Sequence, residues 1–480
     1  MNNRDKRKYL YDRAGFGIDL KGWRANTSIN ALVKHLLDMP APEVIASVSD
    51  EEWQANSPKA LKAMKEMQMD ASDVKMKQKD FRQKTAELNM LWGDEMVKTE
   101  HPLREKMALF WHGHFATRSD NPYFDQLLLH DLRTHALGHF SDLLTAVSHS
   151  PAMLRFLNNQ QNRKQHPNEN FAREVMELFT LGRGHYTEDD IKEAARAFTG
   201  WAYDDDGVFI FREKAHDAGT KNFLGKTGNF NGDDVLKIIL EQRQTAVFLT
   251  QKIYRFFVNE EELNEARIAS LAKDFYDSNY DIGALLHQIF TASWFYDAAN
   301  VGAHIKSPIE LLVGLQRLIP IEFKNERTLI NLQKVLGQQL FYPPNVAGWP
   351  GGRAWIDSSS LVIRLSLPEA FFGEKELNLH AKEQDAEMDM MSRKIVTGAV
   401  QKEERFRVSK VAADWSGFLA GWQDTDRDKL PDELASFFFG TNLSADRKAN
   451  VLRFADPSST EHYIKSLTIL FMSLPEYQLT

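Results

Sequence analysis

Apolar side chains recur every three or four positions along most of the chain, the spacing that places them on one face of an α-helix. We therefore predict an all-α protein, built as a large, bundle-like array of many helices. The predicted helices span residues 20–38, 58–98, 101–115, 121–136, 139–148, 168–181, 188–199, 232–257, 261–276, 306–318 and 325–337.

Signals for β-strands are scarce, and the clearest is the run Val208–Phe211, which follows the turn-forming residues 204–207. We predict at most one small β-hairpin, near residues 207–216, whose second arm leads into His216. No extended sheet is expected.

The pattern also divides the chain into three parts. Residues 1–373 form the predicted helical core domain. Residues 374–407 are charged and rich in Met, which predicts a linker or a lid helix. Residues 408–480 are predicted to form a C-terminal helical cap, since aromatic side chains such as Trp415 and Trp422 recur there at helical spacing.

The composition excludes several classes of protein. With 480 residues and 43% hydrophobic content, the chain can bury a sizeable core. Its net charge of -8 gives no attraction to nucleic acid, and the short basic run Lys6–Lys8 is expected to be solvated. The absence of cysteine excludes disulfides, thiolate metal sites and cysteine nucleophiles. Because no apolar run reaches membrane length or resembles a signal-peptide core, we expect no membrane span and, for the chain as written, a cytoplasmic location.

The segment 166–201 carries more ionisable groups at fixed helical offsets than a core helix needs. Within its first predicted helix, Glu169, Arg173 and Glu177 follow one another at i, i+4 and i+8, the geometry of intrahelical ion pairs. We expect them on one face, with at least one carboxylate buried and bonded to a residue outside the helix, because a buried carboxylate needs a partner. The alternative is a set of solvated pairs worth about 0.3–0.5 kcal/mol each.

Two further features belong to this segment. Asn170 and Glu174 form another i, i+4 pair on the same predicted helix, which Asn168 is expected to cap. The second predicted helix begins after Thr187, because Thr187 and Asp190 have the spacing of a capping box.

His112 and His114 lie two positions apart in the predicted helix 101–115. If that helix is regular through both residues, their side chains point about 200° apart and cannot share a metal ion. If Gly113 breaks the helix, both imidazoles can fall on one side.

Imidazole and carboxylate groups together suit zinc, manganese, iron or nickel. Glu174 and Glu177 have the i, i+3 spacing that can place two ligands on one ion. No HExxH motif is present, so a divalent metal is a hypothesis that rests on residue type alone. Its candidate ligands are His112, His114, Glu174, Glu177 and His216.

Trp349 and Arg353 lie in a loop rich in Gly and Pro. They are candidates for a platform that binds sugar rings, or they fix the loop to the helical body. The loop lacks the Lys-Ser/Thr ending of a P-loop, and the chain contains no G-x-S-x-G elbow.

Six segments of the chain form a distinctive set, which consists of residues 11–17 (YDRAGFG), 103–115 (LREKMALFWHGHF), 148–154 (SHSPAML), 168–201 (beginning NENFAREV), 216–225 (HDAGTKNFLG) and 343–352 (PPNVAGWPGG). Taken in order along the chain, they resemble a large bacterial family designated domain of unknown function 1800 (DUF1800). The resemblance implies a shared helical architecture and no established reaction. Relatives often carry export signals, so a chain trimmed of one would be periplasmic or exported. They are also often encoded beside a family similar to sulfatases and alkaline phosphatases.

Two functions remain open. We favour a binding or maturation partner of a sulfatase- or alkaline-phosphatase-like protein in glycan or sulfate-ester metabolism, which would explain a helical protein without a familiar catalytic motif. The alternative is a metal-dependent hydrolase or transferase with a His/Glu/Arg pocket. The catalytic candidates are Glu174, Glu177, His114 and His216, and the ligand-binding candidates are Arg173, Lys221, Asn170, Trp349 and Arg353.

We also predict that three elements, His112–His114, Glu174–Glu177 and His216–Lys221, line one cleft. Convergence would let their polar groups satisfy one another or a ligand. Lys221 and Arg173 would then hold an anionic group of the substrate. The structural alternative is a buried ionic cluster that only fixes helix packing.

Overall fold

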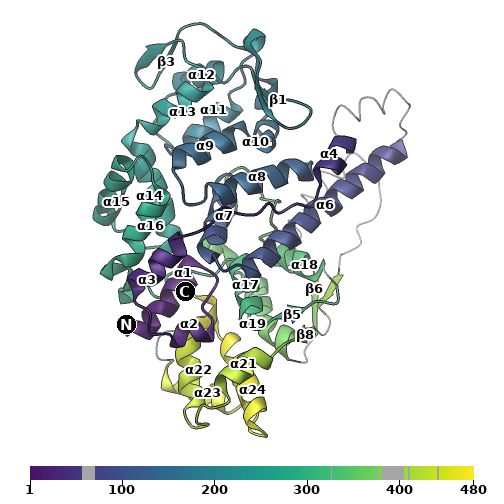
Figure 1. Ribbon diagram of the computed structural model, residues 1–480, viewed down its shortest axis with the longest axis vertical. Coiled ribbons are helices and arrows are strands. Elements are labelled where there is room, and N and C mark those ends of the chain that lie inside the picture. Colours follow the sequence, from purple (N-terminus) through teal and green to yellow (C-terminus); the bar gives the residue numbers. More distant parts are fainter. Residues whose placement is uncertain (57–70, 326, 374–375, 381–404, 409–410, 440–442) are drawn as a thin grey trace.

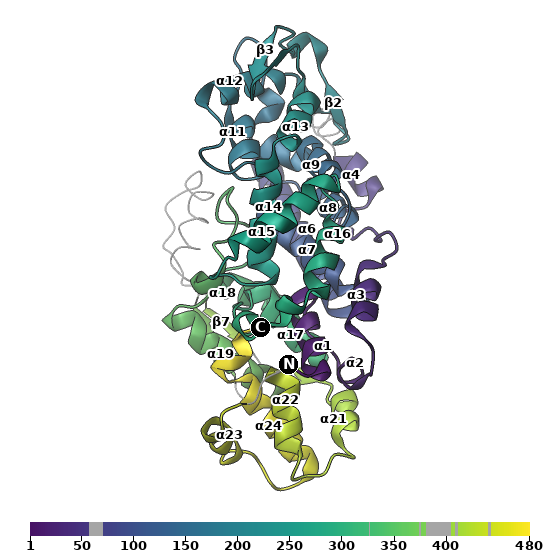
Figure 2. The ribbon, with the colours of Figure 1, turned by 90° about the vertical axis from the view of Figure 1, so that its left-hand side faces the viewer.

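The structure is a computed structural model that describes residues 1–480 except 57–70, 326, 374–375, 381–404, 409–410 and 440–442. The described chain is predominantly α-helical, which confirms the predicted fold class. The molecule is elongated, and its helices follow one another in groups along the long axis (Figures 1 and 2). No helix among the described residues is both long and apolar enough to cross a membrane.

The helices are distributed along this axis as Figure 1 shows. One end is built from α9 (Phe140–His149), α10 (Pro151–Phe156), α11 (Asn170–Glu177), α12 (Glu188–Ala197) and α13 (Gly232–Leu240). The middle contains α4 (Asp50–Asn56), α6 (Ala71–Lys98), α7 (Pro102–His114), α8 (Pro122–Thr134), α14 (Arg243–Phe257), α15 (Glu265–Asp277) and α16 (Ile282–Thr291). Toward the other end lie α1 (Asn3–Ala14), α2 (Leu20–Arg24), α3 (Ile29–Leu37), α17 (Pro308–Leu318), α18 (Arg327–Leu336), α19 (Ser358–Phe372), α21 (Ser416–Trp422), α22 (Leu430–Phe439), α23 (Ala445–Leu452) and α24 (Thr460–Met472).

The strands are all short, and the described residues form four two-stranded antiparallel sheets rather than a single hairpin. The predicted strand is present as β2, but it pairs with the preceding segment and not with the one that leads into His216. The reason is the turn at residues 204–207, which lies before β2 and therefore joins it to an upstream strand. The pairs are β1 (Trp201–Tyr203) with β2 (Phe209–Phe211), β3 (Lys221–Phe223) with β4 (Lys226–Gly228), β5 (Ile321–Glu322) with β8 (Ala412–Ala413), and β6 (Leu377–His380) with β7 (Arg405–Val408).

The two helices of the segment 166–201 form with different limits. α12 begins with the predicted capping box of Thr187 and Asp190. α11 is shorter than predicted. The side chain of Asn168 accepts from the N–H of Asn170 at 3.0 Å, so the helix starts only at Asn170.

The apolar cores contain side chains from helices that are far apart in the sequence, including helices from two of the three predicted parts. α7 lies near the centre of the molecule (Figure 1), and its Trp111 belongs to the core that runs from α1 to the segment after α16. A second core contains Trp23, Leu311 and Leu367 together with Trp422 and other residues of the C-terminal helices. The predicted linker or lid at 374–407 falls mainly outside the described residues, and its described ends form β6 and β7.

Candidate functional site

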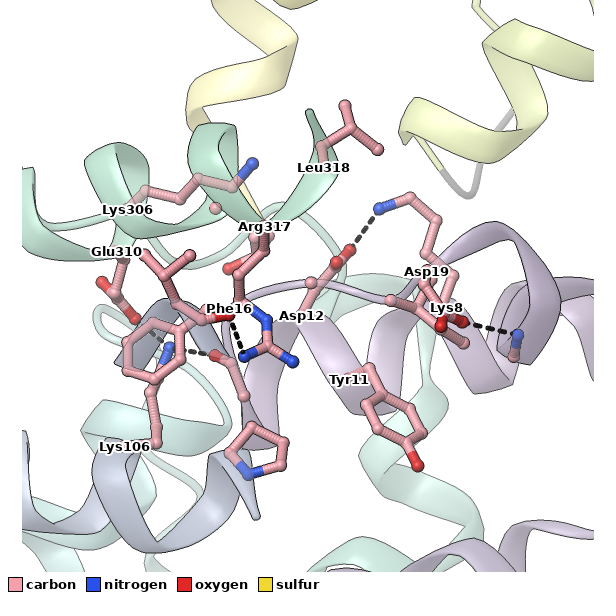
Figure 3. Close-up of a pocket in the computed structure, with 18 of the residues that line it drawn as sticks. Lys8, Tyr11, Asp12, Phe16, Asp19, Lys106, Lys306, Glu310, Arg317 and Leu318 are labelled. Carbon is pink, nitrogen blue, oxygen red and sulfur yellow. Dashed lines mark hydrogen bonds and ion pairs between the residues drawn. The ribbon is translucent and has the colours of Figure 1, made fainter. Parts of the chain in front are cut away.

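A cavity of about 380 Å³ opens between α1, α2, the start of α7, α17 and the C-terminal residues. We call it the α1–α17 cavity (Figure 3). Five cationic side chains and four carboxylates line it. None of the residues that the sequence predicted as catalytic, ligand-binding or metal-binding is among its lining residues. The charged ones are Lys8, Lys98, Lys106, Lys306, Arg317, Asp12, Asp19, Glu100 and Glu310.

The turn after α1 forms one wall of this cavity. It belongs to residues 11–17, the first of the segments that resemble the family, and its contacts show what that segment does in the fold. Arg13 is buried and donates to the last two carbonyl groups of α14, at 3.1 and 2.9 Å, and to the hydroxyl of Thr480, at 3.1 Å. Gly17 has a φ of 113°, a conformation that favours glycine, and its N–H donates to the carbonyl of Tyr11 at 3.2 Å. The element therefore anchors α1 and shapes the cavity wall.

A chain of charged groups runs along one side of the cavity. Lys106 pairs with Glu310 and also donates to the carbonyl of Gly15 at 2.9 Å (Figure 3). The same carboxylate contacts His304 Nε2 at 3.0 Å, and His304 Nδ1 lies against Glu260. Burial raises the pKa of Glu310, but the charges of His304 and Lys106 outweigh it and hold that pKa well below its usual value. The protein thus neutralises Glu310 with its own cations.

Lys306 is different, because the described chain places no carboxylate within ion-pair distance of it. Its Nζ donates to the carbonyl of Tyr477 at 2.8 Å and lies 3.7 Å from the centroid of that residue's ring. Burial lowers the pKa of Lys306 to about 7, although Asp12 acts in the opposite direction. An amine that is half protonated near neutral pH can both attract an anion and act as a nucleophile.

Arg317 lines the cavity from the last turn of α17 (Figure 3). One of its terminal nitrogens donates to three carbonyl groups at the C-terminal end of α6, those of Met96, Val97 and Thr99, at 2.9, 2.9 and 3.1 Å. A cation at this end of a helix is favourable because the helix dipole is negative there. Within the described chain, the guanidinium group has no carboxylate partner at ion-pair distance.

The remaining charges of the cavity have assigned partners or face solvent. Asp12 pairs with Lys8 at 2.5 Å, and Asp19 accepts from the N–H of Gly22 at 2.6 Å, so that it caps α2. Lys98 pairs with an aspartate of α6 at 2.6 Å and is mostly exposed. Lys306 and Arg317 are therefore the lining cations that the described chain leaves without an ion pair.

Arg173 and Glu177 lie on α11 as predicted, whereas Glu169 is the residue just before the helix, and all three lie in the other part of the molecule. Arg173 contacts Glu188 at 2.8 and 2.9 Å and Glu169 at 3.4 Å. Glu177 accepts from the hydroxyl of Tyr186 at 2.8 Å, and its side chain is only 16% exposed. One carboxylate is thus largely buried and bonded outside the helix, which confirms that part of the prediction.

Two other candidate residues, Asn170 and Glu174, also lie on α11. Asn170 is exposed at the start of the helix. Glu174 is partly buried, and burial together with the nearby charge of Glu177 raises its pKa.

The segment from His216 to Lys221 packs against α12 and the residues just after it. His216 Nδ1 contacts the carbonyl of Thr199 at 2.9 Å, and Asp217 accepts from Arg196 at 2.7 and 3.2 Å. Lys221 is buried and donates to two main-chain carbonyls of its own loop at 2.6 and 3.0 Å. Lys221 therefore holds the loop in its conformation.

α7 is regular through both of its C-terminal histidines, so they point in different directions, as the regular-helix alternative predicts. His112 Nε2 accepts from the N–H of Phe341 at 3.0 Å, and burial lowers its pKa to about 3. His114 Nε2 lies 3.1 Å from the carbonyl of Phe179, and its Nδ1 lies 3.1 Å from Lys252 Nζ. A carbonyl only accepts and an ammonium only donates, so His114 is neutral with its proton on Nε2. The two rings do not share a ligand position.

The predicted metal ligands are not gathered into one group. Among the residues that the structure describes, no three His, Asp or Glu side chains are arranged to hold a metal ion. Of the three elements expected to line one cleft, His114 contacts the segment just after α11, whereas His112 faces Phe341 and His216 contacts Thr199 beyond α12. No contact between the described residues joins all three elements.

The Gly- and Pro-rich loop packs against α7. Gly348 has a φ of 79°, and a Cβ atom there would lie 2.3 Å from the carbonyl oxygen of Gly113. The ring of Trp349 lies 5.5 Å from an α7 imidazole, and Arg353 pairs with Glu261 on the surface at 2.5 and 2.7 Å. These contacts favour a loop that is fixed to the body over a sugar-binding platform.

The cavity residues were not found from the sequence. Lys6–Lys8 was expected to be solvated, and this is wrong for two of its residues: Arg7 and Lys8 are only 5% and 7% exposed. The sequence contains one signal near the cavity, the spacing of Ser307 and Glu310, which form a capping box at the start of α17. Nothing local indicated that this glutamate would meet Lys106 across the fold.

Comparisons with known proteins identify the family to which the chain is similar. A family model described as "Protein of unknown function (DUF1800)" matches residues 9–479. No curated protein and no solved structure matches the chain.

Proposed function

The chain belongs to the DUF1800 family, and on that premise we propose that it is a binding protein that takes an anionic ligand into the α1–α17 cavity. The observation that carries the proposal is the position of Lys306, whose ammonium group lines the cavity with a carbonyl and an aromatic ring as its partners. Neither partner carries a formal negative charge. An anionic ligand would supply the missing counter-charge.

Charge pairing within the cavity supports this proposal. Lys8 pairs with Asp12 and Lys106 pairs with Glu310, so the positive charges of these two lysines are largely neutralised. Lys306 and Arg317 contribute positive charge that the described chain does not cancel by ion pairing. In a partly enclosed cavity such charges attract an anion more strongly than they would in bulk water.

The proposal extends to a partner of defined chemistry. Enzymes similar to sulfatases and alkaline phosphatases act on esters of anionic groups, and the family resemblance suggests such an enzyme as the partner. We propose that the protein binds or helps to mature it, in the metabolism of glycans or sulfate esters. The alternative of a metal-dependent hydrolase has weaker support, because His112, His114 and His216 each already have a protein partner.

Isothermal titration calorimetry tests the ligand part of the proposal. Inorganic sulfate, inorganic phosphate and glucose 6-sulfate are titrated into the full chain, with neutral glucose as the reference. We expect at least one anion to bind and Lys306→Met to weaken it about tenfold or more, the scale of one lost charged hydrogen bond. The control is Lys273→Met, since Lys273 pairs with Asp277 on the exposed face of α15. The proposal fails if no anion binds better than glucose, or if both variants lose affinity equally.

Co-production tests the partner part separately. The protein is expressed together with the sulfatase- or alkaline-phosphatase-like protein encoded nearest to it, and the two are analysed by size-exclusion chromatography. We expect them to co-elute, or the enzyme to gain activity when it is produced together with this chain. Separate elution with unchanged enzyme activity would contradict the partner proposal and leave anion binding intact.

A further inference from the structure

We infer that Lys306 is a carbonyl-reactive amine, and that the ligand of the α1–α17 cavity is an anion that also carries an aldehyde or ketone group. This inference rests on the proposed function, because it assigns a substrate class to the same cavity. It goes further, since it predicts a covalent bond between the ligand and one named side chain.

The geometry around Lys306 supports a nucleophilic role. The amine lines a cavity that is large enough for a small metabolite, and α17 begins two residues later. One N–H donates to the carbonyl of Tyr477, and this bond is available to the neutral amine as well as to the ammonium group. The nitrogen is therefore held in position in both protonation states.

Burial allows the neutral amine of Lys306 to exist near neutral pH. Burial is the main cause of the lowered pKa, and the groups that act on Lys306 from the elements packed around it are of both signs. At pH 7, about half of such amines are neutral, against about one in two thousand for a lysine of ordinary pKa near 10.4. The facing groups are Asp12, Lys8, Glu310 and Arg364, together with the ring and carbonyl of Tyr477.

The chemical step is condensation to an imine. The lone pair of the neutral amine attacks the carbonyl carbon, and a carbon–nitrogen bond forms as the carbonyl π bond opens to a carbinolamine. Both hydrogens of the amine leave with the former carbonyl oxygen as one molecule of water, and a carbon–nitrogen double bond remains. No oxidant or reductant takes part. Arg317, which stays charged throughout, is the second lining cation that has no ion pair within the described chain, and we assign to it the anionic group of the ligand.

Reductive trapping with glyoxylate tests this inference on the full chain. Glyoxylate is a small anion with an aldehyde, and borohydride reduction turns its imine into a stable carboxymethyl group that peptide mass mapping can locate. Glycolate, which has the same charge and a hydroxyl group in place of the aldehyde, serves as the matched ligand. Lys273 is the internal reference, because its ion pair with Asp277 raises its pKa. We expect the adduct on Lys306 at pH 7 to exceed that on Lys273 by about a hundredfold or more, given the difference in neutral fraction.

The variant Lys306→Arg separates this inference from the proposed function. Arginine keeps the positive charge and has no reactive neutral amine at this pH, so the variant should bind glycolate and form no adduct at position 306. If wild-type protein binds glycolate but its Lys306 is labelled no more than Lys273, the inference is wrong and the proposed function stands. If no adduct forms and neither glycolate nor any of the titrated anions binds, both are wrong. Should the arginine variant fail to fold, the labelling ratio in the wild-type protein decides alone.

Discussion

Replacing Glu310 with Gln should destabilise the centre of the cavity wall strongly, because it removes one charge from a buried ionic chain. The side chains of Lys106 and Glu310 are only 2% and 3% exposed, and the same carboxylate also contacts His304. Glutamine has nearly the same size, so the substitution leaves no void. What remains is an ammonium group and an imidazole that have lost their shared counter-charge.

The size of the effect follows from burial. Removing one partner of a buried ion pair costs about 3–5 kcal/mol, because the other charge stays desolvated. The surface pair of Arg353 and Glu261 is a matched contrast, since its side chains are 82% and 55% exposed. Removing that pair should cost about 0–1 kcal/mol.

Native-state hydrogen exchange measures this difference locally, which suits a chain with several cores. In Glu310→Gln we expect the protection of amides in α7 and α17 to fall about a hundredfold or more, at about 1.4 kcal/mol for each factor of ten. In Glu261→Gln, protection should stay nearly constant. Adding Lys106→Met to Glu310→Gln should recover part of the loss, because the orphaned cation is then gone. Equal protection in the two single variants would refute the reasoning.

Three further outcomes are expected. The affinity for sulfate should fall about tenfold between pH 6 and pH 8, because Lys306 is a cation below its pKa of about 7 and neutral above it, and calorimetry of Lys306→Arg should show a flat profile. His114→Ala should lower the melting temperature, since it leaves the buried carbonyl of Phe179 without its partner and removes one of the two contacts of Lys252, at a cost of about 1–3 kcal/mol, while sulfate binding stays unchanged. Gly348→Ala should destabilise the protein more than Gly351→Ala, because both glycines have a positive φ but only the first would place a Cβ against a neighbouring carbonyl, and equal melting temperatures would contradict this.

Local features of the fold could be predicted from the sequence where the determining residues are neighbours along the chain. The capping box of Thr187 and Asp190 starts α12 as predicted, since both of its hydrogen bonds lie within one helical turn. The regularity of α7 likewise decides the directions of His112 and His114. The predicted hairpin is wrong in its partner strand: the turn at residues 204–207 precedes β2, so β2 pairs with the upstream strand β1.

The cavity could not be predicted in this way, because its groups are distant in sequence. Lys106 and Glu310 are 204 positions apart, and neither differs locally from a solvated charge on an amphipathic helix. Lys306 precedes a helix and is followed by a capping box, which predicts only where α17 begins. Its amine is held by the carbonyl of Tyr477, which the C-terminal segment brings beside it by pairing with residues 304–306. Only the folded chain shows that contact.

The residues that carry the family resemblance and those that carry the proposed chemistry are largely different. His216–Lys221 clamps a loop on α12, and the opening element anchors α1 through Arg13, so each of these motifs holds the backbone in place. Such motifs are easily recognised, because close packing and satisfied hydrogen bonds tolerate few residue types. Lys306 lies outside every quoted segment, yet burial lowers its pKa to about 7. In this fold the motifs that carry the family resemblance hold the backbone in place. The proposed reactive group, Lys306, lies outside them and owes its lowered pKa to its position in the fold.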